Sequence, residues 1–154
     1  MATSKRDLID DLIVAFRASG NQDSAFDNLA AERLGVSRTD LHCLNAIENS
    51  GGLTAGELAA AVGLTSGAVT GVVDRLERAG FARRVPDPQD RRRVKLEVTP
   101  RFYERAGRIW GPLRADWESS LADRFTAAEL VRITEFLELT SEVGKRHLDR
   151  LAGE

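Results

Sequence analysis

The fold of this chain is decided by the stretch Leu53 to Thr99, LTAGELAAAVGLTSGAVTGVVDRLERAGFARRVPDPQDRRRVKLEVT. Its first half predicts two short helices joined by a tight turn. Thr54 and Glu57 have the spacing of a capping box at the start of the first helix. Gly63 lacks the Cβ that opposes the left-handed conformation, so it is expected to end that helix, and Thr65 to cap the next one.

The second of these helices is expected to bury one face and expose the other. The buried stripe follows the i, i+3, i+4, i+7 spacing and comprises Val69, Val72, Val73 and Leu76. The opposite face is uncharged and carries only small or hydroxylated residues: Ser66, Gly67, Thr70 and Gly71. Each glycine inside a helix costs about 1 kcal/mol relative to alanine, so this pair indicates either close approach of a partner or a weak helix start. Close approach to a DNA groove would leave hydrogen bonds for base edges and phosphates.

A β-hairpin is predicted after this helix, which Gly80 is expected to end. Residues 81–85 read as a strand, PDPQD as a turn, and residues 93–98 as a returning strand. In the returning strand, the apolar residues expected to point inward are Val94, Leu96 and Val98. Leu53 is expected to add a residue or two of strand to this small sheet.

The turn of the hairpin carries three consecutive arginines: Arg91, Arg92 and Arg93. Their charges repel one another in water, so such a loop favours nearby anions. A hairpin tip is also narrow enough to enter a minor groove, where the negative potential attracts arginine. We expect Asp90 to pair with Arg92 and fix its direction. A merely solvated basic loop is the alternative, and the neighbouring helix pair makes it the less favoured one.

The run DRLERAGFARRVPDPQDRRRVKLEVT, with LTAGELAAAVGLTSGAVTGVV before it, closely resembles the winged helix-turn-helix of the MarR family of transcriptional regulators. The D-x-R motif of the wing is Asp90 and Arg92, followed at the expected distance by Leu96 and Thr99. The D-R-L-E motif at residues 74–77 adds to the likeness, because the two motifs together are highly specific. The resemblance covers nearly the whole chain.

The resemblance implies a mainly α-helical fold with a small β-hairpin wing, in a single domain spanning residues 1–154. The DNA-reading winged-helix lobe would comprise residues of about 37–99. Family members of this size flank that lobe with helices that dimerise, here expected at about 5–34 and 100–152.

The residue pattern also indicates helices on both sides of the lobe. Residues 7–19 are amphipathic, and a break is expected at Gly20, with residues 21–24 forming a turn or a second helical start. The next helix is expected to begin with a capping box made by Ser37 and Asp40.

A long helix is expected to begin at Thr99 and Pro100, because proline is favoured at the first helical position. Pro112 lies within it, so a kink or a local break is expected near Gly111. Residues 126–129 form another capping box at the start of the last helix.

The terminal helices leave apolar surface exposed, as at Phe136 and Leu137, and a partner helix is the natural cover. A two-fold dimer would place two recognition helices about one DNA turn, roughly 34 Å, apart. The expected target is therefore a pseudo-palindromic double-stranded operator bound by a homodimer.

Composition and charge agree with this interpretation. The 154 residues suit one globular domain, and the single cysteine excludes an internal disulfide. The formal net charge is −2, but residues 74–105 hold ten Arg or Lys against six Asp or Glu, a net of +4, so the remainder carries −6. A basic stripe on an acidic body steers nucleic acid to one face. The chain has no apolar run of membrane-span length, and Asp10 and Asp11 interrupt any signal-peptide core, so a cytoplasmic location is expected.

His42 and Cys43 lie side by side on the helix after Ser37. A zinc site needs more ligands than this pair offers, so no metal is expected. Cys43 is expected to be a packed structural cysteine, with a redox switch as the alternative, since some members of the family sense oxidants through cysteine.

The resembling fold has a cleft between the lobe and the dimerisation helices, and His42 would border it. A cleft for a small aromatic or phenolic effector would be lined by Leu41, His42, Asn45, Trp110, Leu113 and Trp117. Trp110 and Trp117 share a helix face, and aromatic residues at that spacing are more often core.

We therefore expect a dimeric winged-helix transcription factor, a ligand-responsive repressor. The residues expected to contact DNA are Thr65, Ser66, Gly67, Thr70, Gly71, Arg75, Arg91, Arg92 and Arg93. Among them Arg75, Arg91 and Arg93 would hold phosphates, and Arg92 would enter the minor groove. The alternative is a winged-helix module that docks an acidic protein partner. Neither catalysis nor a cofactor is expected, because the chain has no nucleophile with a neighbouring base and no phosphate loop.

Overall fold

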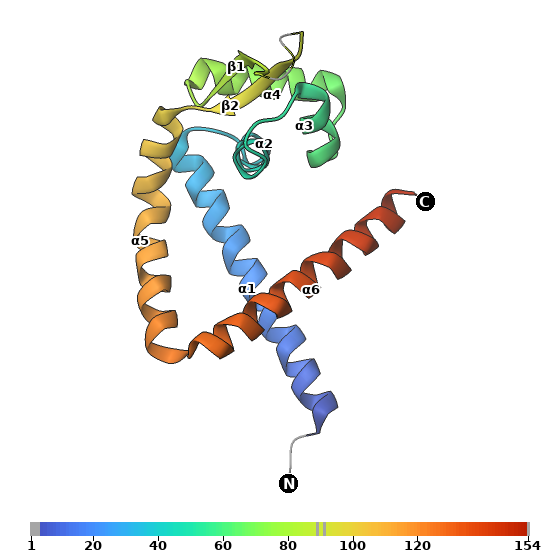
Figure 1. The fold of residues 1–154 in the computed structure, drawn as a ribbon, viewed down its shortest axis with the longest axis vertical. Coiled ribbons are helices and arrows are strands. Elements are labelled where there is room, and N and C mark those ends of the chain that lie inside the picture. The colour runs from blue at the N-terminus through green and yellow to red at the C-terminus, as the bar shows by residue number, and fades with distance from the viewer. Residues whose placement is uncertain (1–3, 89, 91, 154) are drawn as a thin grey trace. The chain divides into compact units, whose positions relative to one another are not determined.

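The computed structural model describes residues 4–88, 90 and 92–153 and is mainly α-helical, with one β-hairpin (Figure 1). Its helices are α1 (Lys5–Leu34), α2 (Arg38–Asn49), α3 (Ala55–Val62), α4 (Ser66–Ala79), α5 (Pro100–Arg124) and α6 (Ala127–Ala152). Its strands are β1 (Ala82–Pro86) and β2 (Val94–Val98). The predicted fold class, helical with a small hairpin wing, is confirmed.

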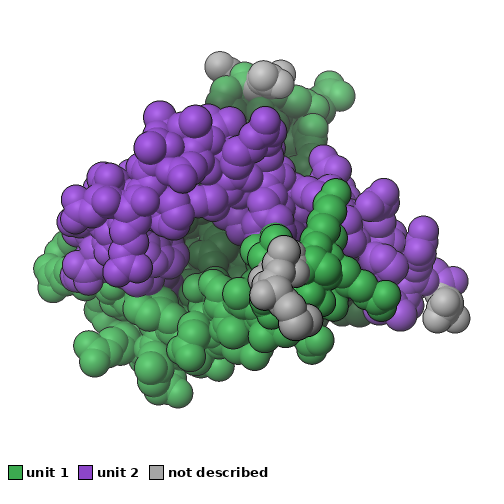
Figure 2. Space-filling model, turned by 90° about the horizontal axis from the view of Figure 1, so that it is seen from below, with its two compact units in different colours: residues 1–109 green, residues 110–154 purple. Residues whose placement is uncertain are grey.

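The chain divides into two compact units, residues 1–109 and 110–154, which Figure 2 colours separately. The first unit contains α1 to α4, the hairpin and the beginning of α5. The second contains the remainder of α5 and α6. That residues 1–154 act as one domain stays a prediction.

The helices α3 and α4 form the predicted helix-turn-helix. Thr54 and Glu57 make the reciprocal capping box, with the Glu57 carboxylate 2.8 Å from the Thr54 amide. Gly63 ends α3 in the left-handed region at φ 66°, and Thr65 caps α4. The pair is bent by 109°, within the range of about 90–120° typical of this motif. Within the described residues, no single helix is long and apolar enough to cross a membrane; by length and composition alone, this bent pair could.

The core of the first unit is made by apolar side chains of α2, α3, α4 and β2, and it includes the predicted stripe of α4. The fully buried side chains include Leu41, Leu44, Ile47, Leu58, Val69, Val73, Leu76 and Leu96. Phe81 and Phe102 meet edge to face with ring centroids 5.9 Å apart, so the start of α5 packs on the root of the hairpin. Burying each such side chain contributes roughly 1.5–3 kcal/mol.

The hairpin pairs β1 and β2 antiparallel, with Arg84 opposite Leu96. Leu53 joins the sheet as predicted, with hydrogen bonds of 3.2 and 2.7 Å to the backbone of Leu96. The prediction that Val94 points inward is wrong: it is 50% exposed, whereas Leu96 is 2% exposed. Val94 lies opposite Pro86 at the far end of the ladder, and strong twist in a two-stranded ribbon turns its end away from the core.

The helix break predicted at Gly20 does not occur, and neither does a local break near Gly111; a kink there stays a prediction. The helix α1 runs unbroken through Gly20 for 30 residues, and its N-terminus is fixed by a capping box of Ser4 and Asp7 that sequence reasoning missed. A glycine penalty of about 1 kcal/mol is small for a helix of this length. The helix α5 likewise continues through Gly111 and Pro112 for 25 residues. Proline there removes one backbone donor, and the helix retains its turns on both sides.

Gly52 provides a direct test of the junction between α2 and the sheet. Its φ is 114°, and a Cβ would lie 3.3 Å from the Leu96 carbonyl oxygen. We expect Gly52→Ala to lower the free energy of unfolding by roughly 1–3 kcal/mol, measured by urea denaturation. Gly107→Ala is the matched control, because nothing lies within 4 Å of its Cβ position, and it should raise stability by about 0.5–1 kcal/mol. Equal stability of the two variants would contradict this account.

Candidate nucleic-acid interface

The helix α4 exposes the small, uncharged face that the sequence predicted. Ser66, Gly67 and Thr70 are exposed and Gly71 is half-buried, while the opposite stripe is buried. A Cβ at Gly67 would meet nothing within 4 Å. At Gly71 it would meet only the Nη1 of Arg75, at 3.6 Å. The fold itself therefore has room for larger side chains at both positions.

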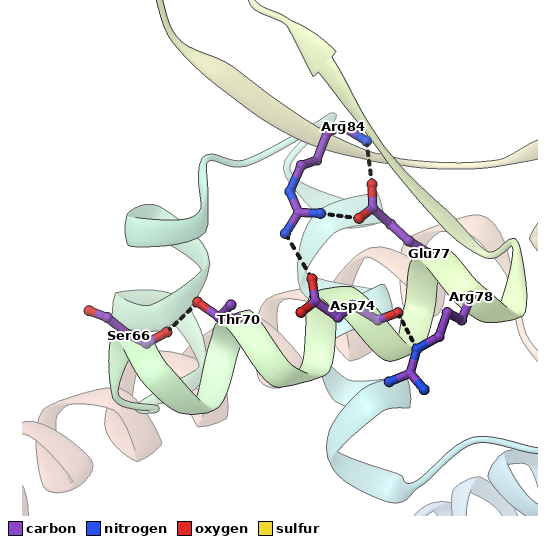
Figure 3. Close-up of polar contacts among 6 residues, drawn as sticks. All are labelled: Ser66, Thr70, Asp74, Glu77, Arg78 and Arg84. Carbon is purple, nitrogen blue, oxygen red and sulfur yellow. Dashed lines mark hydrogen bonds and ion pairs between the residues drawn. The ribbon is translucent and has the colours of Figure 1, made fainter.

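The hydroxyl of Thr70 has a defined direction. It donates to the Ser66 carbonyl at 3.0 Å (Figure 3), so its only proton is used within the helix. Its oxygen lone pairs remain as acceptors on the exposed face. In a major groove, such an acceptor matches the amino group of cytosine or adenine.

Arg75 connects α4 to α2 through a bidentate ion pair. Its Nη2 lies 2.7 Å from Oδ1 of Asp40, and its Nε lies 3.3 Å from Oδ2. The Asp40 residue is only 3% exposed, and its carboxylate also accepts from the Ser37 amide at 3.1 Å in the predicted capping box. Burial alone would raise the pKa of the Asp40 carboxyl, but the hydrogen bonds from Arg75 and Ser37 outweigh it, so the pKa lies below its ordinary value.

Arg84 of β1 fastens the wing to the recognition helix. Its guanidinium bonds the Glu77 carboxylate and lies 3.2 Å from Asp74, and its backbone amide donates to Glu77 as well (Figure 3). Sequence reasoning noted Asp74 and Glu77 as part of a motif and gave them no structural role. Their i, i+3 spacing places two carboxylates on one helix face. This spacing is the signal in the sequence that could have predicted a basic partner for both, here Arg84.

The base of the wing turn is fixed by a second ion pair. Arg93, predicted to hold phosphate, places its Nη2 2.5 Å from the Glu57 carboxylate of α3. Lys95 pairs with the buried Asp87 at 3.2 Å, another acidic residue that sequence reasoning missed. The wing is therefore attached to both helices of the helix-turn-helix.

The tip of the wing differs in detail from the prediction. The Asp90 carboxylate accepts from the backbone amide of Arg92 at 3.0 Å, so it shapes the loop rather than pairing with the guanidinium as expected. A short polar side chain commonly bonds the backbone two residues on in this way. Arg92 is exposed, and its guanidinium has no ion pair among the residues described. Arg91 lies outside the described residues.

Three of the six residues predicted to line the effector cleft lie in the first unit. Leu41, His42 and Asn45 line a small cavity together with Asp27 and Arg38. Arg38 is oriented by Asn28, whose side-chain oxygen lies 2.6 Å from its Nη1. The other three predicted residues, Trp110, Leu113 and Trp117, belong to the second unit, so a joint cleft stays a prediction.

Cys43 has the environment of a packed structural cysteine. Its residue is fully buried, and burial together with the nearby Asp40 carboxylate raises the pKa of its thiol. A thiol with a raised pKa holds little of the reactive thiolate. The described residues include no cluster of three or more His, Cys, Asp or Glu that could hold a metal ion.

The comparisons with known proteins agree with this geometry. The model of the MarR family matches residues 36–94. An uncharacterised HTH-type transcriptional regulator of Bacillus subtilis (strain 168), YcgE, is 34% identical over 96% of this chain and 96% of its own length. The chain belongs to the MarR family.

Solved structures show the same fold. The transcriptional regulator BldR from Sulfolobus solfataricus is 26% identical, with a TM-score of 0.56 over 88% of this chain and 99% of that one. RV1404 from Mycobacterium tuberculosis has a TM-score of 0.64 at 22% identity, over 94% of this chain and 97% of that one. This MarR-family chain is thus a winged-helix DNA-binding transcriptional regulator, and it is not an enzyme, because its family and its relatives are transcriptional regulators.

The ion pair of Asp40 makes folding stability depend on pH. Because the folded-state pKa of Asp40 lies below its ordinary value, the ionised carboxyl stabilises the fold above that ordinary value. We expect Asp40→Asn to be less stable than the wild type at about pH 7 in urea denaturation. The difference should shrink below about pH 4, as the wild-type carboxyl becomes protonated. A difference that persists undiminished to about pH 2 would rule out the ion pair as its source.

Proposed function

We propose that this MarR-family regulator is a homodimeric repressor that binds an inverted repeat in duplex DNA and is released by a small ligand. The observation that carries the proposal is the exposed face of α4, which is uncharged and has open space above Gly67. The wing of the same lobe carries an exposed arginine, Arg92. A surface without long side chains can approach base edges closely, and the wing supplies charge for the flanking backbone.

The residues of the lobe take different parts in this complex. Thr65, Ser66, Gly67, Thr70 and Gly71 face the major groove, with Thr70 acting as an acceptor. Arg92 enters the minor groove, where the negative potential favours an unpaired guanidinium. Arg75 and Arg93 meet phosphates with the nitrogens that their carboxylate partners leave open.

Exposed apolar side chains on the flanking helices support the homodimer. On α1 they are Leu8, Ile9, Leu12, Ile13, Val14 and Phe16, and on α6 they include Val131, Leu137, Leu139, Val143, Leu148 and Leu151. Apolar surface left exposed on each of these helices marks a protein interface. A two-fold axis through it brings two α4 helices to one face of a duplex.

The ligand response is proposed at the cavity beside α2. His42, Asn45 and Arg38 supply polar groups over the apolar Leu41, a combination that suits a small phenolic or acidic effector. Because α2 also holds Arg75 through Asp40, a ligand that shifts α2 would change the DNA affinity of α4.

Selection of duplexes from a random library tests the function. We expect the wild type to enrich an inverted repeat whose half-sites lie about one helical turn apart, with two protomers bound per duplex by light scattering. Binding should weaken steeply with salt. Enrichment of no sequence, with equal weak binding to every duplex, would contradict the proposal and favour docking of an acidic protein.

The reading face is tested by enlarging a glycine on it. Gly67→Gln should fold normally, because the space above Gly67 is open in the free protein. It should bind the selected duplex about tenfold or more weakly, a penalty of roughly 1.4 kcal/mol, because the new side chain fills the gap to the groove. Gly107→Gln is the control, an equally open helical position on α5, and should bind as the wild type does. Unchanged affinity of Gly67→Gln would show that α4 does not approach DNA closely.

A further inference from the structure

The ion pair between Asp40 and Arg75 fixes the pose of a guanidinium on the DNA-facing helix. Two of the guanidinium nitrogens, Nε and Nη2, bond the two carboxylate oxygens of Asp40. A bidentate contact of this kind sets direction as well as distance, because both groups are planar. The carboxylate is itself rigid, being buried and bonded to the Ser37 amide.

The third guanidinium nitrogen of Arg75 is directed differently. Its Nη1 lies beside Gly71, 3.6 Å from the point where a Cβ would stand, at the edge of the exposed face of α4. The Arg75 side chain is 48% exposed, in contrast to 4% for that of Asp40. One edge of the guanidinium is thus turned into the protein, and the remaining N–H groups are available outside it.

We propose that Asp40 is a positioning residue for DNA binding, which holds Arg75 so that its Nη1 meets a phosphate of the duplex. The proposal rests on the proposed function, in which the N-terminal half of α4 enters the major groove. Arg75 is nine residues beyond Ser66, the first residue of α4, so it lies where the helix passes the DNA backbone. A side chain oriented before binding loses less conformational freedom when the complex forms.

Simple electrostatics and positioning by Asp40 predict opposite changes in DNA affinity when the Asp40 charge is removed. A carboxylate beside a DNA-contacting arginine repels the phosphates and partly cancels the arginine charge, so its removal would strengthen binding. Positioning predicts that its removal weakens binding. The sign of the change therefore separates the two roles without reference to its size.

The experiment compares three single substitutions in the full-length protein. Asp40→Asn removes the charge and keeps the shape of the side chain. Arg75→Lys keeps the positive charge on an exposed position but cannot make the bidentate contact. Glu48→Gln is the control, because it removes one negative charge from an exposed position on the same helix as Asp40. Anisotropy titrations at several salt concentrations use the selected duplex and a scrambled duplex of equal length, and circular dichroism confirms folding.

We expect Asp40→Asn and Arg75→Lys each to bind both duplexes about tenfold more weakly than the wild type. The salt slope should fall by about one for Asp40→Asn, as for the loss of one phosphate contact. Glu48→Gln should bind at least as tightly as the wild type. An Asp40→Asn and Arg75→Lys double variant should be no weaker than either single variant, because both changes disrupt one unit.

Two results would overturn the proposal. One is wild-type or tighter binding by a folded Asp40→Asn, as simple electrostatics predicts. The other is an Arg75→Lys variant with the affinity and salt slope of the wild type. This result would show that the bidentate contact is not needed for DNA binding, even if Asp40→Asn fails to fold. The proposed function is contradicted by a different result: wild-type protein that binds the selected duplex no more tightly than the scrambled duplex.

Discussion

Burial of one face of α4 determines what its other face can do. Val69, Val73 and Leu76 are almost completely removed from water against α2, α3 and the hairpin. Burying three such side chains is worth roughly 5–9 kcal/mol before the cost of ordering the chain, comparable to the net stability of a small domain. The rotation of the helix about its axis is therefore fixed, and Ser66, Gly67 and Thr70 must face outward.

A set of ion pairs builds a frame around that face. Asp40 holds Arg75, Asp74 and Glu77 hold Arg84, and Glu57 holds Arg93. The Asp40 carboxylate is buried, so its pair also contributes to stability, whereas the exposed pairs of Arg84 and Arg93 contribute about 0–1 kcal/mol each. The importance of all of these pairs for the interface is geometric. They connect α4 to α2, the wing to α4, and the wing to α3, which leaves Arg92 as an exposed, unpaired cation among the described wing residues. Residues 74–105 have a net charge of +4, but that total does not show which cations are free to contact DNA. The positions of the ion pairs do show it.

The sequence was sufficient wherever the decisive interaction is local. The capping boxes begun by Ser37, Thr54 and Thr126, and the left-handed Gly63 and Gly80, follow from residues within one helical turn of each other. The buried stripes follow from periodicity in the same way. Both the fold class and the exposed face of α4 were therefore predicted correctly.

Long-range pairing could not be predicted in that way. Arg75 and Asp40 are separated by 35 positions, and Arg93 and Glu57 by 36. With 22 basic and 24 acidic residues in the chain, no pattern in the sequence indicates which of them meet. The break expected at Gly20 was wrong for a related reason: local propensity is a weak preference, and a long helix overrides it.

Methylation interference on the selected duplex is the most direct test of the claim that α4 reads the major groove. Dimethyl sulfate methylates guanine at N7, in the major groove, and adenine at N3, in the minor groove. If α4 reads the major groove and Arg92 the adjacent minor groove, N7 methylation should block binding in two half-sites one turn apart. N3 methylation should block it in the minor grooves that flank them. Binding that tolerates N7 methylation throughout the duplex would contradict the assignment of α4 as the reading helix.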